Sequence, residues 1–153
     1  MNEAIKQRAR AIIFMGDSIV SMYREFNDRC FYTFPGGGQE GAETMEECVV
    51  REVTEEFGIT VEPIKEVYVY KNEISEEHFY ICKYICGTLF TGKGEEFQAD
   101  RNRGVYKPTT IKLSDIPNLP LMPPEVAESL FKDYTKYGTQ LRSRVKTIKA
   151  KLK

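Results

Sequence analysis

Three glutamates, Glu52, Glu55 and Glu56, crowd one short segment of the chain. If this segment is a helix, carboxylates three or four positions apart are neighbours and repel by a few tenths of a kcal/mol per pair. A divalent cation between them would turn the repulsion into attraction, and all-oxygen ligands select a hard ion such as Mg²⁺ or Mn²⁺. The alternative is an acidic patch on a solvated helix face, which is what a run of charges usually forms.

The helix expected to carry these acids spans residues 45–57. Thr44 and Glu47 have the spacing of a capping box, and Gly58 suits the left-handed position that ends a helix. Steps of 100° per residue put the three glutamates beside the apolar stripe, toward the interior, and put Arg51 on the other side. Inward acids in the C-terminal half of a helix are unfavourable without a cation, because the macrodipole disfavours anions there.

A glycine-rich stretch, Pro35 followed by residues 36–38, comes shortly before this helix. Proline and consecutive glycines predict an irregular loop. Since glycine has no side chain, its backbone carbonyls and amides can approach a metal or a phosphate closely. The loop, the helix cap and the inward acids together favour the cation site over the solvated patch.

The segment 37–59 resembles the signature of the Nudix hydrolases. That signature is a glycine, five residues, a glutamate, seven residues, and then Arg-Glu-apolar-x-Glu-Glu-x-Gly-apolar. The constrained positions all match, as Gly37, Glu43, Arg51, Glu52, Val53, Glu55, Glu56, Gly58 and Ile59. The resemblance implies an α/β/α sandwich and hydrolysis of a nucleoside diphosphate linked to another moiety, with Mg²⁺ or Mn²⁺ as cofactor.

The resemblance also implies roles for the acids. Glu52, Glu55 and Glu56 would hold the metal, with a backbone carbonyl at Gly37 or at the glycine before it. Glu52 and Glu55 remain alternatives for the catalytic base that takes the proton of the attacking water.

The remaining signature residues are implied to support the catalytic acids. In the family, the residue matching Arg51 pairs with the one matching Glu43, which orients Glu52 and closes the loop onto the helix. We therefore group Arg51 with the catalytic residues, and Gly37, Glu43 and Gly58 form the structural part of the signature.

Residues outside the signature could bind the substrate. Arg10 and Arg24, in the first two predicted strands, could reach phosphates, although a surface arginine is the ordinary state of either. Glu95 and Glu96 lie in a polar loop that could supply a further ligand or base, or be an exposed acidic loop. A base could also stack on aromatic residues that otherwise belong to the core, namely Phe31, Tyr32, Tyr80 and Tyr106.

The rest of the chain predicts an α/β fold, a sandwich of helices around a mixed β-sheet. Helices are expected over 125–137 and 140–152. Alternating apolar residues and turn signals predict strands over 8–14, 18–25, 31–34, 59–70, 77–90 and 105–113.

The length of 153 residues predicts a single domain over 1–153. Net charge is −1, yet seven of the 22 basic residues lie in 135–153, where there is no acid. We expect the basic segment 139–153 to be a helix with an apolar stripe that packs on the body or on a second subunit, as a monomer or a homodimer. Seven charges without interleaved aromatic residues disfavour a nucleic-acid partner.

The composition also limits compartment and chemistry. No apolar run approaches the roughly 20 residues that span a bilayer, and there is no secretory signal, so we expect a cytoplasmic protein without a membrane partner. His78 is the only histidine, which disfavours a histidine-rich metal site. The four cysteines form no C-x-x-C pair and are expected to be small apolar residues.

Three functions remain at this point. The first is a pyrophosphohydrolase of a small nucleotide, either a nucleoside triphosphate (including an oxidised one) or a sugar nucleotide such as ADP-ribose. The second is a non-catalytic Nudix-fold module that binds a nucleotide and regulates another process. The third is a protein-interaction domain that uses the basic tail, which would leave the glutamates without a purpose. The intact glutamates favour the enzyme, while the exact substrate, the phosphorus attacked and the number of metals stay open.

Overall fold

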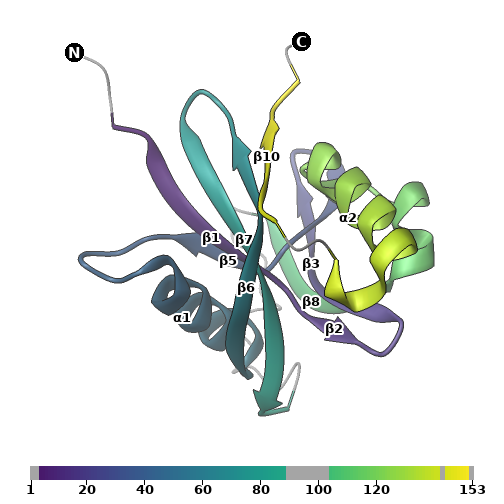
Figure 1. Ribbon diagram of the computed structural model, residues 1–153, viewed down its shortest axis with the longest axis horizontal. Helices are drawn as coiled ribbons and strands as arrows, with labels where there is room; N and C mark the ends of the chain where they lie inside the picture. The colour runs from purple at the N-terminus through teal and green to yellow at the C-terminus, as the bar shows by residue number, and fades with distance from the viewer. Residues whose placement is uncertain (1–3, 89–103, 142–143, 152–153) are drawn as a thin grey trace.

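The computed structural model describes residues 4–88, 104–141 and 144–151. Within these residues, strands and helices follow one another in the order predicted for most of the chain (Figure 1). The elements are β1 (Lys6–Ile12), β2 (Phe14–Met15), β3 (Ser18–Phe26), β4 (Arg29–Thr33), β5 (Gly36–Gly38), α1 (Met45–Phe57), β6 (Thr60–Lys71), β7 (Ser75–Cys86), β8 (Val105–Lys112), the 3-10 helix η2 (Leu113–Asn118), β9 (Leu121–Met122), α2 (Pro124–Tyr137), the 3-10 helix η3 (Gly138–Gln140) and β10 (Lys146–Lys149).

The strands form two sheets. Sheet A has the order β10-β6-β7-β1-β5, and it is mixed, because β1 runs parallel to β7 while β5 runs antiparallel to β1. Sheet B has the order β2-β3-β4-β9, with β8 also paired to β3. The predicted mixed sheet is therefore confirmed as sheet A, and sheet B adds a second one.

Sheet A lies between the two helices, with α1 on one side and α2 on the other (Figure 1). Side chains alternate along β1, so Ala9 and Ala11 lie in the core under α1 while Ile12 lies in the core under α2. The core under α1 also includes Val20, Met22, Val49, Val53 and Phe57. The core under α2 also includes Tyr68, Phe79, Leu130, Leu141 and Ile148. This arrangement confirms the α/β/α sandwich.

Helix α1 has the ends that its sequence predicts. The Thr44 hydroxyl accepts a hydrogen bond from the Glu47 N–H at 3.1 Å, and the Glu47 carboxylate accepts one from the Thr44 N–H at 2.8 Å. Gly58 ends the helix at φ +70°, a conformation that glycine adopts without strain. These local bonds fix where the acidic helix starts and stops.

The prediction of an irregular loop at the three glycines was wrong. Gly36–Gly38 form β5, which pairs antiparallel with β1 in a register that sets Gly36 opposite Arg10. Gly36 has φ +142°, and a Cβ there would overlap the carbonyl oxygen of Ala9. Only glycine lets the two strands approach this closely, so the sequence that suggested a loop in fact builds an edge strand.

The predicted C-terminal helix over 140–152 was also wrong. Residues 146–149 form β10, which extends sheet A parallel to β6, and Ile148 is buried there. Val145 is 48% exposed, so the expected helical stripe does not form. The free edge of β6 offers a row of backbone hydrogen bonds, and pairing with it replaces the helix.

Two further expectations remain. Glu95 and Glu96 lie outside the described residues. Within the described ranges, no helix combines the length and apolar character needed to cross a membrane.

Candidate active site

The C-terminal half of α1 lies directly against the glycine strand β5. The Glu56 carboxylate accepts a hydrogen bond from the Gly36 N–H at 3.0 Å. A Cβ on Gly37 would lie 2.6 Å from the Glu52 carboxylate. Glycine at these positions therefore allows two acids of one helix turn to touch the backbone of the neighbouring strand.

Arg51 joins the loop to the helix. Its Nε and Nη2 donate to the two oxygens of Glu43 at 3.1 and 2.7 Å, and Nη2 also donates to the Gly38 carbonyl at 3.0 Å. Its Nη1 reaches Glu52 at 3.1 Å and Glu55 at 3.3 Å. The Arg51–Glu43 pair implied by the Nudix resemblance is present, whereas the prediction that Arg51 faces away from the glutamates was wrong.

The three glutamates differ in exposure. The side chain of Glu52 is 17% exposed and that of Glu55 is 60% exposed. Glu56 is half-buried against β5. The predicted inward position is confirmed for Glu52 and Glu56 and was wrong for Glu55, which lies at the rim beside Arg51.

Hydrogen bonding lowers the pKa of Glu43, whereas burial raises the pKa of Glu56. The bidentate bond from Arg51, with a second bond from the Glu40 N–H, lowers the pKa of Glu43 to about 2. The same partnership with Glu43 raises the pKa of Arg51 further above its usual value. Burial raises the pKa of Glu56 to about 7, although the Gly36 N–H and the charge of Arg10 oppose the rise. The ionised form of Glu56 is therefore costly in this position unless a cation compensates it.

The donor atoms at this site are the oxygen ligands that a hard divalent cation prefers. Glu52 and Glu56 supply carboxylate oxygens, and the missing side chain of Gly37 leaves room beside Glu52. Cys48, buried in α1, donates its thiol to the Gly37 carbonyl at 3.5 Å. In the described part of the chain, no three Asp, Glu, His or Cys side chains are arranged around one common point. The Nη1 of Arg51, bonded to both Glu52 and Glu55, sits between two of the acids.

The two arginines predicted to bind substrate lie in different surroundings. Arg10 donates from Nε to Glu77 at 2.8 Å and from Nη1 to the Phe34 carbonyl at 3.2 Å, beside the glycine strand. Arg24 lies in sheet B, where its guanidinium stacks 3.9 Å from the centre of the Tyr106 ring and 5.5 Å from that of Phe31. The structure thus brings Arg10 to the site and places Arg24 in an aromatic cluster.

Sequence reasoning missed Glu77, the partner of Arg10. The two side chains meet because β1 and β7 run side by side in parallel, with Arg10 opposite Phe79 and Glu77 two pairs away, on the same face of the sheet. No local signal in the sequence reports such a pairing, since the two residues are far apart along the chain.

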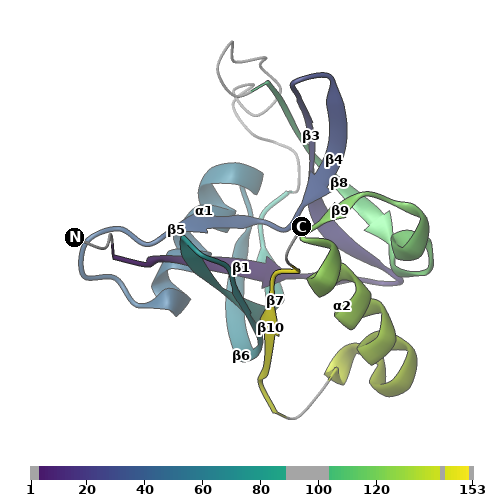
Figure 2. The same ribbon diagram turned by 90° about the horizontal axis from the view of Figure 1, so that it is seen from above.

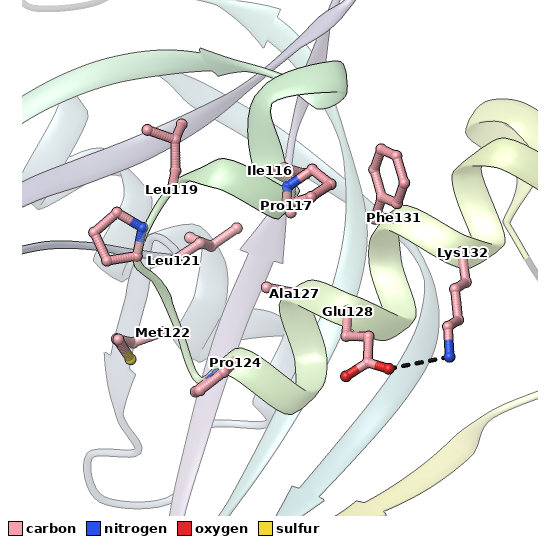
Figure 3. A pocket seen from close by; sticks show the side chains of 11 residues that line it. Ile116, Pro117, Leu119, Leu121, Met122, Pro124, Ala127, Glu128, Phe131 and Lys132 are labelled. Atoms are coloured by element: carbon pink, nitrogen blue, oxygen red, sulfur yellow. Dashed lines mark ion pairs between the residues drawn. The ribbon is translucent and has the colours of Figure 1, made fainter.

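A concave region lies away from the glutamates, between η2, β9 and α2 (Figure 3). It has a volume of about 340 Å³ and an apolar lining that includes Leu119, Leu121 and Phe131. An ion pair between Glu128 and Lys132, 3.0 Å long, runs along its edge. No residue of the Nudix-like signature lines it, so its walls differ in kind from the acidic site.

The family of the chain follows from comparison with known proteins. A family model described as the NUDIX domain matches residues 5–128, so the chain belongs to the Nudix family. A search of curated protein sequences finds no match.

Solved structures share the fold at low identity. An ADP-ribose pyrophosphatase from Streptococcus suis is 23% identical, covers 96% of this chain and 100% of its own, and has a TM-score of 0.65. A NUDIX hydrolase from Nitrosomonas europaea is 15% identical over 98% of this chain and 81% of its own, with a TM-score of 0.73. A MutT NUDIX hydrolase from Burkholderia pseudomallei is 19% identical over 82% of this chain and 96% of its own, with a TM-score of 0.62.

Proposed function

We propose that this protein is a Mg²⁺- or Mn²⁺-dependent pyrophosphohydrolase that cleaves a phosphoanhydride bond in a small nucleotide. The observation that supports this most directly is the contact of Glu52 and Glu56 with the glycine strand, because it draws two acids of a complete Nudix signature inward. A purely structural helix would gain nothing from this arrangement, since burial makes the ionised carboxylate costly.

The buried and the exposed glutamates of the site have different roles in this proposal. Glu52 and Glu56 are the inward carboxylates and would hold the metal, with Glu55 and the Gly37 carbonyl as further ligands. A bound metal screens the phosphate oxygens and lowers the pKa of water. Glu55 is the more exposed of the two base candidates, which favours it over Glu52 for passing the proton of the attacking water to solvent. Arg51 holds both acids in place.

The substrate class is a nucleoside diphosphate linked to another moiety. A structural neighbour named as an ADP-ribose pyrophosphatase supports a sugar nucleotide. A nucleoside triphosphate, including an oxidised one, is the other candidate. Arg10, Arg24 and Glu96 remain candidates for substrate contact. We further propose a cytoplasmic location and a monomeric or homodimeric state.

A panel of nucleotides with Mg²⁺ tests this function. Phosphate release would be measured after a coupled pyrophosphatase or phosphatase, with ADP-ribose, UDP-sugars, and normal and oxidised nucleoside triphosphates side by side. Turnover of at least one class, lost on Glu52→Gln, is the expected result. Nucleotide binding without any turnover would instead support the alternative, a regulatory Nudix-fold module without catalysis.

A further inference from the structure

Arg10 is fixed at two points on the edge of the acidic site. Its Nε donates to Glu77 at 2.8 Å, and its Nη1 donates to the Phe34 carbonyl at 3.2 Å. The side chains of Arg10 and Glu77 are only 20% and 13% exposed, so solvent screens this ion pair weakly. A planar guanidinium held by a carboxylate and a carbonyl keeps one orientation.

The carbonyl that Arg10 holds lies just before the glycine strand. Pro35 follows Phe34, and its own carbonyl accepts a hydrogen bond from the Ala11 N–H at 2.8 Å. Gly36 comes next, opposite Arg10 in the β1–β5 pairing, and it donates its N–H to Glu56 at 3.0 Å. Strands β1 and β5 lie side by side in Figure 2. From the Phe34 carbonyl to the Glu56 carboxylate the connection therefore runs along backbone alone, without a flexible side chain.

This strand needs an anchor more than an ordinary strand does. It has three residues, all of them glycine, and glycine loses more conformational freedom on folding than any other residue. Contacts with adjacent parts of the protein, such as its pairing with β1, must therefore hold the strand in the position that presents the Gly36 N–H to Glu56. An arginine tied to β7 on one side and to the strand entrance on the other supplies this restraint.

We propose that Arg10 and Glu77 form a positioning pair for the metal site, which holds the entrance of the glycine strand so that its backbone and Glu56 meet in one geometry. This inference rests on the proposed function, because it concerns metal binding by Glu56 and its neighbours. It assigns Arg10 a role through the backbone, whereas a role in substrate binding would require direct contact with a phosphate.

The sign of one effect separates positioning from plain electrostatics. Arg10 is a cation beside a cation site, so removing its charge by Arg10→Gln would strengthen metal binding if only long-range charge mattered. Loss of positioning has the opposite effect, and partners behind metal ligands typically contribute about 10- to 100-fold in affinity. Arg8 is a matched control, since it lies on the same strand and its side chain forms no hydrogen bond or ion pair with the described residues.

The experiment is calorimetric titration of Mn²⁺ into wild type, Arg10→Gln, Glu77→Gln and Arg8→Gln. A pH of about 8.5 keeps the carboxylates ionised in every variant. We expect affinity to fall about tenfold in Arg10→Gln and Glu77→Gln, to stay unchanged or rise slightly in Arg8→Gln, and to recover in part in Arg10→Lys. At saturating Mn²⁺, KM for the nucleotide should stay within about twofold of wild type while kcat falls.

Four results would contradict the proposed role of the Arg10–Glu77 pair. Tighter Mn²⁺ binding in Arg10→Gln shows that the charge alone acts, and unchanged binding shows that Arg10 has no part in metal binding. A raised KM at unchanged metal affinity assigns Arg10 to the substrate. If Arg10→Gln does not fold, the nearly isosteric Glu77→Gln decides, and wild-type affinity in that variant contradicts the proposal. Absence of Mn²⁺ uptake by the wild type would reject the proposed function and this inference together, whereas uptake that the variants leave intact rejects the inference alone.

Discussion

The two long helices of this protein pack in the same way and differ in what lies along their edges. Helix α1 has 13 residues and α2 has 14, and each buries an apolar face against the strands. The edge of α1 carries Glu52, Glu55 and Glu56 beside the glycine strand, whereas the edge of α2 lines an apolar pocket with an exposed ion pair. Packing therefore accounts for both helices, and only the edge of α1 offers groups that could do chemistry.

Asp133 of α2 and Glu56 of α1 both turn inward, but they differ in their hydrogen-bond partners. Asp133 of α2 is 8% exposed and accepts a hydrogen bond from the Tyr68 hydroxyl at 2.7 Å. Glu56 of α1 accepts one from the Gly36 N–H, and burial still raises its pKa to about 7. Asp133 thus joins a helix to a sheet, while Glu56 keeps a cost that a bound cation would offset.

The largest expected effect comes from Glu56→Gln in α1. Removing this carboxylate should lower kcat at least about 100-fold, because metal ions contribute several kcal/mol to phosphoryl transfer. The metal-free variant should be at least as stable as wild type, since it carries no buried charge. Steady-state kinetics and thermal melting measure the two effects. Near-full turnover at saturating Mg²⁺ would show that Glu56 has no part in metal binding.

The corresponding experiment on α2 is Leu130→Ala, which should change stability rather than metal binding. Leu130 is fully buried, so its truncation should reduce the free energy of unfolding by about 2–5 kcal/mol. Urea denaturation measures this loss. Below the transition, Mn²⁺ affinity should stay within about twofold of wild type, since no signature residue contacts this side chain. An affinity that falls with the stability would mean that the two helices do not divide structure from chemistry.

A smaller change tests how closely the glycine strand approaches α1. In Gly37→Ala the new methyl group would lie 2.6 Å from the Glu52 carboxylate, so Glu52 must move, and Mn²⁺ affinity should fall about tenfold. Gly38→Ala is the matched control, because nothing lies within 4 Å of a Cβ there. Equal affinities of the two variants would show that the position of Glu52 does not matter for the metal.

The smallest effect concerns the pH dependence of stability. The folded-state pKa of Glu43, about 2, lies below its ordinary value of 4.5, so its pairing with Arg51 stabilises the fold above pH 4.5. That contribution is lost as the pH falls from 4.5 through 2. Glu43→Gln should therefore lose less stability than wild type over this range, as measured by urea denaturation at several pH values.

The exposed Glu62 provides a control for that measurement, because Glu62→Gln removes an acid outside the signature. It should follow the wild-type pH dependence. If Glu43→Gln does so as well, the ion pair with Arg51 contributes nothing to folding.

Much of α1 could be predicted because its signals are local. The capping pair Thr44 and Glu47 and the terminal Gly58 all lie within the segment they control, and the structure confirms each of them. The helical projection failed for Arg51 because it gives the direction of the Cβ atom, while a long side chain bends back to reach Glu43 and Glu52. Glu55 lies at the rim, where it accepts a hydrogen bond from Arg51.

The non-local pairings could not be predicted. Strand β5 was missed because glycine has no strand propensity of its own, and its pairing depends on β1. Strand β10 was missed because Leu141 and Ile148 fit a helical repeat, while the free edge of β6 is visible only in three dimensions. The same reason hid Glu77, whose partner Arg10 lies on a strand that sequence does not show to be adjacent.

Binding of Mn²⁺ to the wild-type protein, followed by the electron paramagnetic resonance signal of the free ion, tests the central claim most directly. The inward carboxylates of α1 predict saturable loss of that signal and a rise in melting temperature, both abolished when Glu52 and Glu56 are replaced together by glutamine. A free-ion signal unchanged by the protein, with and without nucleotide, would contradict the account.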